Sequence, residues 1–253
     1  MADLVLQVNH VDVVYDSDSG FFRKKPGFHA VKDVSFSIEQ GEIMGLVGES
    51  GCGKSTLSKA ILGMQPYTGE IIHYTKRPQM VFQDPYGSLN PAKTVGWIVE
   101  EPLRAFGKYD AKERKRRVAD MLDRVGLGAE YALRRPRELS GGQRQRAMIA
   151  AAFIIDPKLL LADEPTTALD VTVQAQIIEL LKRINVNRGI GILFISHDLH
   201  VIRKLCTHVA VMRSGCIVET GPTEEIFHHP QHEYTQRLIA AIPTREKRKR
   251  ANG

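Results

Sequence analysis

The sequence contains no long uninterrupted run of apolar residues. No segment approaches the eighteen or so residues that a membrane-spanning helix needs. The first four residues, Met-Ala-Asp-Leu, also lack the basic and then apolar pattern of a secretory signal. We therefore expect a cytosolic protein that reaches a membrane only through partner proteins.

Cysteine is scarce, with Cys52, Cys206 and Cys216 as the 3 cysteines of a 253-residue chain. They form no close pair and no metal-spaced cluster, and their odd number argues against a closed disulfide framework. This pattern fits a reducing compartment. With 43% hydrophobic and 25% charged residues, the composition is that of one sizeable globular domain.

Excess charge is small and concentrated at the C-terminus. The net charge is +6, of which the five basic residues and one acidic residue of 245–250 contribute +4. Such a tail can touch anionic lipid or nucleic acid, but a solvated, frayed terminus is the simpler interpretation. We expect 244–253 to be a disordered basic tail and assign it no function.

Hydrophobic periodicity predicts an α/β fold. Near-alternating apolar residues indicate strands over 4–15 and 31–38, with a polar loop over 16–27 between them. Further predicted strands cover 43–47, 159–162, 191–195, 209–212 and 217–219; predicted helices cover 55–62, the interval 94–125 and a segment near 171–187. This alternation predicts a mostly parallel core sheet covered on both faces.

A phosphate-binding loop is predicted directly after the strand over 43–47. The pattern Gly-x-x-x-x-Gly-Lys-Ser/Thr is met by Gly48, Glu49, Ser50, Gly51, Cys52, Gly53, Lys54, Ser55 and Thr56. Its glycines let backbone N–H groups converge on phosphate oxygens at the start of a helix. Lys54 would reach the terminal phosphates and the Ser55 hydroxyl would ligate magnesium.

Two carboxylates end the apolar strand over 159–162. Asp163 and Glu164 are predicted at the carboxyl edge of the sheet, where ligands bind in open α/β folds. Asp163 would hold magnesium and Glu164 would polarise an attacking water. The same spacing is compatible with two acids that cap the next helix.

The segment Leu-Ser-Gly-Gly-Gln over 139–143 resembles the signature of ATP-binding cassette (ABC) ATPases. In that family Ser140, Gly141, Gly142 and Gln143 would face the γ-phosphate of ATP held by a second cassette, which implies a head-to-tail dimer. Alternatively, the serine is only a helix N-cap. The following residues, Arg144 to Ala150, continue the resemblance.

Four single residues fall where ABC cassettes place functional side chains. The resemblance implies that Tyr15 stacks on adenine, although a strand tyrosine often has only a packing role. Gln83 would sense magnesium and the attacking water and couple to the membrane subunit. Asp170 would cross the dimer, and His197 would contact the γ-phosphate.

The resemblance extends from Tyr15 to Ile242 and implies a P-loop cassette over 1–243. Such a cassette has a mostly parallel core sheet, an antiparallel β subdomain at the N-terminus and an α-helical signature subdomain, here about 92–150. It binds ATP and Mg²⁺ and works with a second ABC ATPase subunit, identical or paralogous. Two transmembrane permease subunits would hold it at the cytoplasmic face of the membrane, and a substrate-binding protein would contribute indirectly.

Two segments, 81–91 and 229–238, resemble ATPases that power import of oligopeptides, dipeptides or nickel and metal chelates. No cysteine follows Pro243, so we expect no iron–sulfur cluster there. The main alternative is a soluble ABC ATPase acting on nucleic acid or ribosomes, but a single cassette without sustained heptads gives no reason to expect nucleic acid. A metabolic kinase and the ATPase of an exporter with separate membrane subunits are further alternatives.

Overall fold

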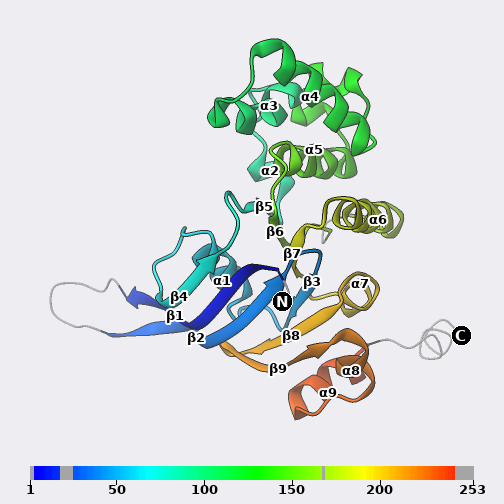
Figure 1. Cartoon of the computed structure of the whole chain (residues 1–253). Helices are drawn as coiled ribbons and strands as arrows, with labels where there is room; N and C mark the ends of the chain where they lie inside the picture. The colour runs from blue at the N-terminus through cyan, green and yellow to red at the C-terminus, as the bar shows by residue number, and fades with distance from the viewer. Residues whose placement is uncertain (1–2, 18–24, 167–168, 243–253) are drawn as a thin grey trace, which may run out of the picture. The chain divides into compact units, whose positions relative to one another are not determined.

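The structure is a computed structural model that describes residues 3–17, 25–166 and 169–242. Its contacts divide the chain into two compact units (Figure 1). The first unit comprises 1–7, 37–42 and 72–194, and the second comprises 8–36, 43–71 and 195–253. Each unit is described by itself.

A three-stranded antiparallel sheet forms near the N-terminus, with most of its residues in the second unit. Its strands lie in the order β2 (Lys25–Glu39), β1 (Leu4–Ser17) and β4 (Thr68–His73). β1 and β2 reach further into the predicted 16–27 loop than the sequence indicated; 18–24 lies outside the described residues. The antiparallel N-terminal sheet is thus confirmed.

The rest of the second unit is built on strand β3 (Ile43–Val47), which is buried throughout. It pairs in parallel with β8 (His208–Arg213), and β8 pairs antiparallel with β9 (Cys216–Pro222). Residues 214 and 215 both adopt positive φ in the turn between β8 and β9. Its helices are α1 (Lys54–Ile61), α7 (Leu199–Leu205), α8 (Thr223–His228) and α9 (Glu233–Ala240).

The first unit contains the other strands of the core. β5 (Gln79–Val81), β6 (Leu159–Asp163) and β7 (Gly191–Ile195) are neighbours in that order, and β5 and β6 run parallel. Every residue of β6 and β7 is buried, as in a sheet covered on both faces. Helix α6 (Val171–Arg188) connects β6 to β7.

Between β5 and β6 the chain is helical. The elements are α2 (Pro85–Ser88), α3 (Val95–Phe106), α4 (Ala111–Arg124), two 3₁₀ turns (Ala129–Leu133 and Pro136–Glu138) and α5 (Gly141–Phe153). Figure 1 shows α3, α4 and α5 gathered together. The predicted 94–125 helical interval is two helices, capped at their N-termini by Thr94 and Asp110. Gly107, at φ 69°, ends the first of them.

The α/β fold class is confirmed, with parallel strand pairs, an antiparallel N-terminal sheet and a helical segment that carries the signature. Among the described helices, none is both long enough and apolar enough to span a bilayer.

Candidate functional site

The phosphate loop occupies the turn from β3 to α1 in the second unit. Two of its glycines are required by their surroundings. A Cβ atom on Gly48 would lie 2.1 Å from the carbonyl oxygen of Met212, and one on Gly53 would lie 2.3 Å from that of Ala30. Gly53 is also the N-cap of α1 at φ 110°, a conformation that other residues rarely adopt. The loop therefore keeps its path only with glycine at both positions.

Lys54 folds over this loop. Its Nζ donates hydrogen bonds to the carbonyl oxygens of Gly48, at 2.8 Å, and Glu49, at 2.9 Å. The Sγ atom of Cys52 lies 3.7 Å from the same ammonium group. Only 6% of Lys54 is exposed, so a buried cation sits within a glycine-rich loop at the start of a helix, where anions are stabilised.

Two tyrosines contact the loop from distant parts of the second unit. The Tyr15 hydroxyl lies 3.2 Å from Oγ1 of Thr56, so the predicted adenine-stacking residue is indeed next to the loop. The hydroxyl of Tyr234, in α9, accepts a hydrogen bond of 3.1 Å from the backbone N–H of Glu49. No sequence signal indicated this second contact, which joins residues 185 positions apart.

His197 belongs to the same unit and lies just beyond the end of β7. The buried Ser196 precedes it, and the Ser196 hydroxyl accepts a hydrogen bond of 3.0 Å from the Asp198 backbone. Asp198 in turn caps α7. His197 itself is exposed, and the hydrogen bond between its two neighbours, Ser196 and Asp198, holds the backbone around it. This is the position at a strand's carboxyl end that ligand-contacting residues take in α/β sheets.

In the first unit, strand register brings Gln83 to Glu164. Val81 of β5 pairs with Ala162 of β6, so the residues two positions beyond each are neighbours. Nε2 of Gln83 donates a hydrogen bond of 3.2 Å to Oε2 of Glu164. Glu164 adopts φ 46°, an uncommon backbone conformation for a non-glycine residue that is enriched at functional sites.

Asp163, the last residue of β6, is buried with 6% of its surface exposed. Helix α6 is capped by Asp170, whose Oδ1 accepts from the Val173 backbone at 2.9 Å. The alternative in which Asp163 and Glu164 cap the next helix is therefore wrong, because another aspartate does so.

The signature segment forms the start of α5. Ser140 is its N-cap: the Ser140 hydroxyl accepts from the Gln143 backbone at 3.3 Å, and the Gln143 side chain accepts from the Ser140 backbone at 2.9 Å. Through this capping box the serine stabilises the start of α5. It leaves the N-terminal end of a 13-residue helix as a site of positive potential.

The signature glycines pack against the start of α6. A Cβ atom on Gly142 would lie 2.5 Å from Cγ1 of Val173, whereas one on Gly141 would lie 3.6 Å from Cδ2 of Leu169, an ordinary contact. Only Gly142 is therefore sterically required. The structure thus joins the signature to the helix that Asp170 begins.

Magnesium prefers oxygen ligands and usually keeps several from water and phosphate. Ser55 offers a hydroxyl in the first turn of α1, and Asp163 offers a carboxylate at the end of β6. Within the described parts of the chain, no three His, Cys, Asp or Glu side chains converge as a metal cage. Each of the two side chains, taken by itself, offers an oxygen donor of the kind that magnesium binds together with phosphate and water.

A phosphate loop, a strand that ends in two carboxylates and a serine-glycine helix start define an ATP-binding cassette. The family model described as "ABC transporter" matches residues 31–167, and that of the "Oligopeptide/dipeptide transporter, C-terminal region" matches 218–253. The chain therefore belongs to the ABC transporter family, and it is an ATPase that binds ATP.

Similar proteins agree with this assignment. The oligopeptide transport ATP-binding protein OppF of Lactococcus lactis subsp. lactis (strain IL1403) is 44% identical over 98% of this chain and 83% of its own length. The glutathione import ATP-binding protein GsiA of Pectobacterium atrosepticum is 44% identical over 98% of this chain and 43% of its own. A solved dimeric cassette, MJ0796, in a post-hydrolysis state with ADP and Pi, has a TM-score of 0.74 at 29% identity, covering 86% of this chain and 98% of its own.

Proposed function

We propose that this ATPase powers the import of peptides through separate membrane subunits. The observation that carries the proposal is the match of its C-terminal part, 218–253, to the oligopeptide/dipeptide transporter region. The names of OppF and GsiA refer to oligopeptides and glutathione. We therefore propose peptides, rather than nickel or metal chelates, as the cargo.

Hydrolysis in this proposal depends on charge neutralisation and on a positioned water. Lys54 and the loop N–H groups bind the phosphates of ATP, with Tyr15 against adenine. Ser55, Gln83 and Asp163 supply oxygen ligands for Mg²⁺, which when bound would neutralise phosphate charge. Glu164 orients the water, and its hydrogen bond to Gln83 supports that role because it fixes the carboxylate. His197 contacts the γ-phosphate.

A second cassette completes the site. Ser140, Gly141, Gly142 and Gln143 would meet the γ-phosphate held by that partner, and Asp170 would cross the interface. The positive end of α5 supports this, as does the dimeric state of MJ0796. ATP then favours the closed dimer and hydrolysis favours separation, which membrane subunits follow.

Two substitutions test the enzymatic assignment. Glu164→Gln should retain ATP binding and lose turnover by about 100-fold or more, as expected when the carboxylate that polarises the attacking water is removed. Lys54→Ala should lose ATP binding itself. Glu179→Gln, an exposed position on α6, is the control and should leave both unchanged. Ready turnover by the Glu164 variant would remove that residue from its proposed role.

Purification from membranes tests the transport assignment. The tagged chain, gently solubilised from its own host, should bring a second cassette ATPase, two multi-span subunits and a peptide-binding lipoprotein. This result would also establish peripheral attachment at the cytoplasmic face of the membrane. Recovery of ribosomes or nucleic acid without membrane subunits would overturn the importer and leave the ATPase intact.

A further inference from the structure

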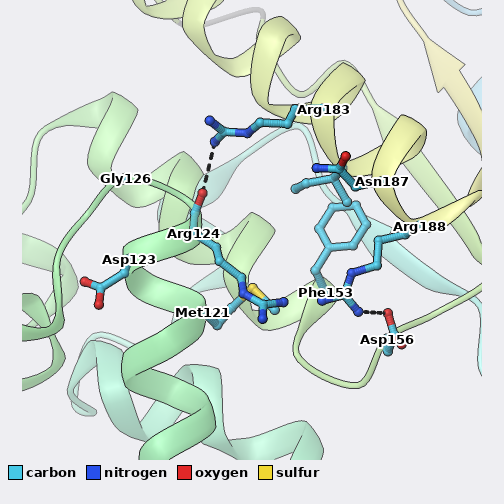
Figure 2. Close-up of a pocket in the computed structure, with 10 residues that line it drawn as sticks. Met121, Asp123, Arg124, Gly126, Phe153, Asp156, Arg183, Asn187 and Arg188 are labelled. Atoms are coloured by element: carbon cyan, nitrogen blue, oxygen red, sulfur yellow. Dashed lines mark hydrogen bonds and ion pairs between the residues drawn. The ribbon is translucent and has the colours of Figure 1, made fainter.

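A cleft of about 640 Å³ opens in the first unit where α4, α5 and α6 end (Figure 2). Its apolar surface comes from Met121, Phe153 and Ile184, and three arginines stand around it: Arg124, Arg183 and Arg188. None of the cleft's residues belongs to the phosphate loop, the strand-end carboxylates or the signature. Its volume is in the range of small-molecule sites, about 300–1,000 Å³.

Not all of the positive charge is balanced by carboxylates. Arg188 forms an ion pair with Asp156. Arg183 instead donates to the carbonyl oxygen of Arg124, at 3.1 Å, and so satisfies the end of α4. Across the described parts of the chain, the guanidinium of Arg124 and that of Arg183 have no carboxylate partner, and Figure 2 shows the Asp123 carboxylate turned away from both.

A structural role alone does not account for this imbalance. On the neighbouring surface of α4, arginines are matched: Arg116 pairs with Glu113 and Asp120, and Arg117 pairs with Glu113. At the end of α4, Arg146 donates to the carbonyl oxygen of Val125 at 2.5 Å, and Arg183 donates to that of Arg124. The bond to Arg124 uses one of the five N–H donors of the Arg183 guanidinium.

Arg146 adds a like charge beside Arg183. Burial and then the nearby charge of Arg183 lower the pKa of the Arg146 guanidinium. Burial is the larger cause; the smaller one is repulsion between the protonated Arg146 and Arg183, which a bound anion would offset.

We propose that this cleft binds a small organic anion. A carboxylate, sulfonate or phosphate group would lie between Arg124 and Arg183, whose planar guanidinium groups suit such oxygens. An aromatic or apolar body would lie against Met121, Phe153 and Ile184, and the Asn187 amide, which also lines the cleft, would add a polar contact. This site does not depend on the identity of the transported cargo.

The test uses a pair of probes that differ by one charged group. The fluorescent sulfonate 8-anilinonaphthalene-1-sulfonate is titrated into the purified full chain, and its uncharged analogue N-phenyl-1-naphthylamine is titrated in parallel. The variants are Arg124→Gln and Arg183→Gln. Lys182→Gln is the control, because it removes one positive charge from an exposed position on α6 outside the cleft.

The sulfonate should bind saturably to the wild type, and each arginine variant should weaken it about tenfold, the loss of roughly one charge-assisted hydrogen bond. Lys182→Gln should leave that affinity within about twofold, and Arg124→Lys should retain part of it. The uncharged probe should not distinguish the variants. Equal sulfonate affinity in all variants, an equal loss in the lysine control, or no saturable binding would overturn the proposal. Circular dichroism establishes that each variant is folded.

Discussion

Gly142→Ala is expected to destabilise the protein by about 1–2 kcal/mol. The new Cβ atom would lie 2.5 Å from Cγ1 of Val173, well inside the ~3.5–4.0 Å at which carbon atoms attract. Val173 is a stiff neighbour, because a valine in a helix has one strongly preferred χ1 rotamer. The middle of the range for overpacking is about 2 kcal/mol, and alanine returns at most about 1 kcal/mol over glycine in a helix, which leaves a loss of about 1–2 kcal/mol.

Thermal unfolding measures this loss. For a chain of this size about 1 kcal/mol shifts the melting temperature by roughly 2–4 °C, so we expect a drop of roughly 2–8 °C. Val173→Ala removes the obstructing methyl group, and in that background Gly142→Ala should change the melting temperature by less than about 2 °C. Gly141→Ala is the control, because its Cβ would meet Leu169 at an ordinary 3.6 Å.

An equal drop in both backgrounds would refute the reasoning, because the loss would then not depend on Val173. ATP turnover adds a second readout. Since the Cβ of residue 142 points at α6, the double variant should regain turnover together with stability. If stability recovered without turnover, the proposed contact with a second cassette would itself require glycine at residue 142, independently of the packing against Val173.

Three further outcomes are expected. Tyr234→Phe removes the hydroxyl that accepts from Glu49 and should weaken ATP binding about fivefold by calorimetry, the value of one hydrogen bond near 1 kcal/mol. Burial raises the pKa of Glu219, but its other contacts outweigh burial and lower the pKa; among them are hydrogen bonds from the backbone N–H groups of Gln231, at 2.7 Å, and His232, at 3.0 Å. Because the folded pKa is depressed, this stabilisation is complete above about 4.5 and is lost as pH falls; the gap in melting temperature between wild type and Glu219→Gln should close below that pH. N-ethylmaleimide should inactivate the enzyme through Cys52, ATP should slow the reaction, and Cys52→Ala should resist it.

The buried parallel strands could be predicted because a short and almost wholly apolar run has few structural interpretations other than a buried strand. Mostly apolar runs over 43–47, 159–162 and 191–195, each followed by glycine or a polar residue, became β3, β6 and β7 within one residue. β4 was missed, since its sequence Thr-Gly-Glu-Ile-Ile-His has no clear alternation and its first half is exposed. It forms because Gly69 allows close approach to the His10 carbonyl oxygen, 2.1 Å from where a Cβ atom would lie.

The sequence motifs predicted which residues form the candidate site. The contacts between those residues and their neighbours became known only from the structure. The hydrogen bond between Gln83 and Glu164 follows from the pairing of β5 with β6, yet β5 has three residues and carries little sequence signal. The Tyr234 contact with Glu49 links residues 185 positions apart, and no local pattern encodes it. Both are products of tertiary packing.

The cleft and the proposed dimer contacts lie at opposite ends of the same two helices. α5 starts at the signature and ends at Phe153, and α6 starts after Asp170 and ends at Arg188. Arg146 ties the two together, since it donates to the end of α4 and to Gln176 of α6 at 2.9 Å. Helices are stiff, so an anion that draws Arg124 toward Arg183 would change how the ends of α4 and α6 pack. Any resulting tilt of α6 would move Val173, which fills the space where a side chain on residue 142 would lie. A ligand at the cleft could therefore bias the signature without touching the nucleotide.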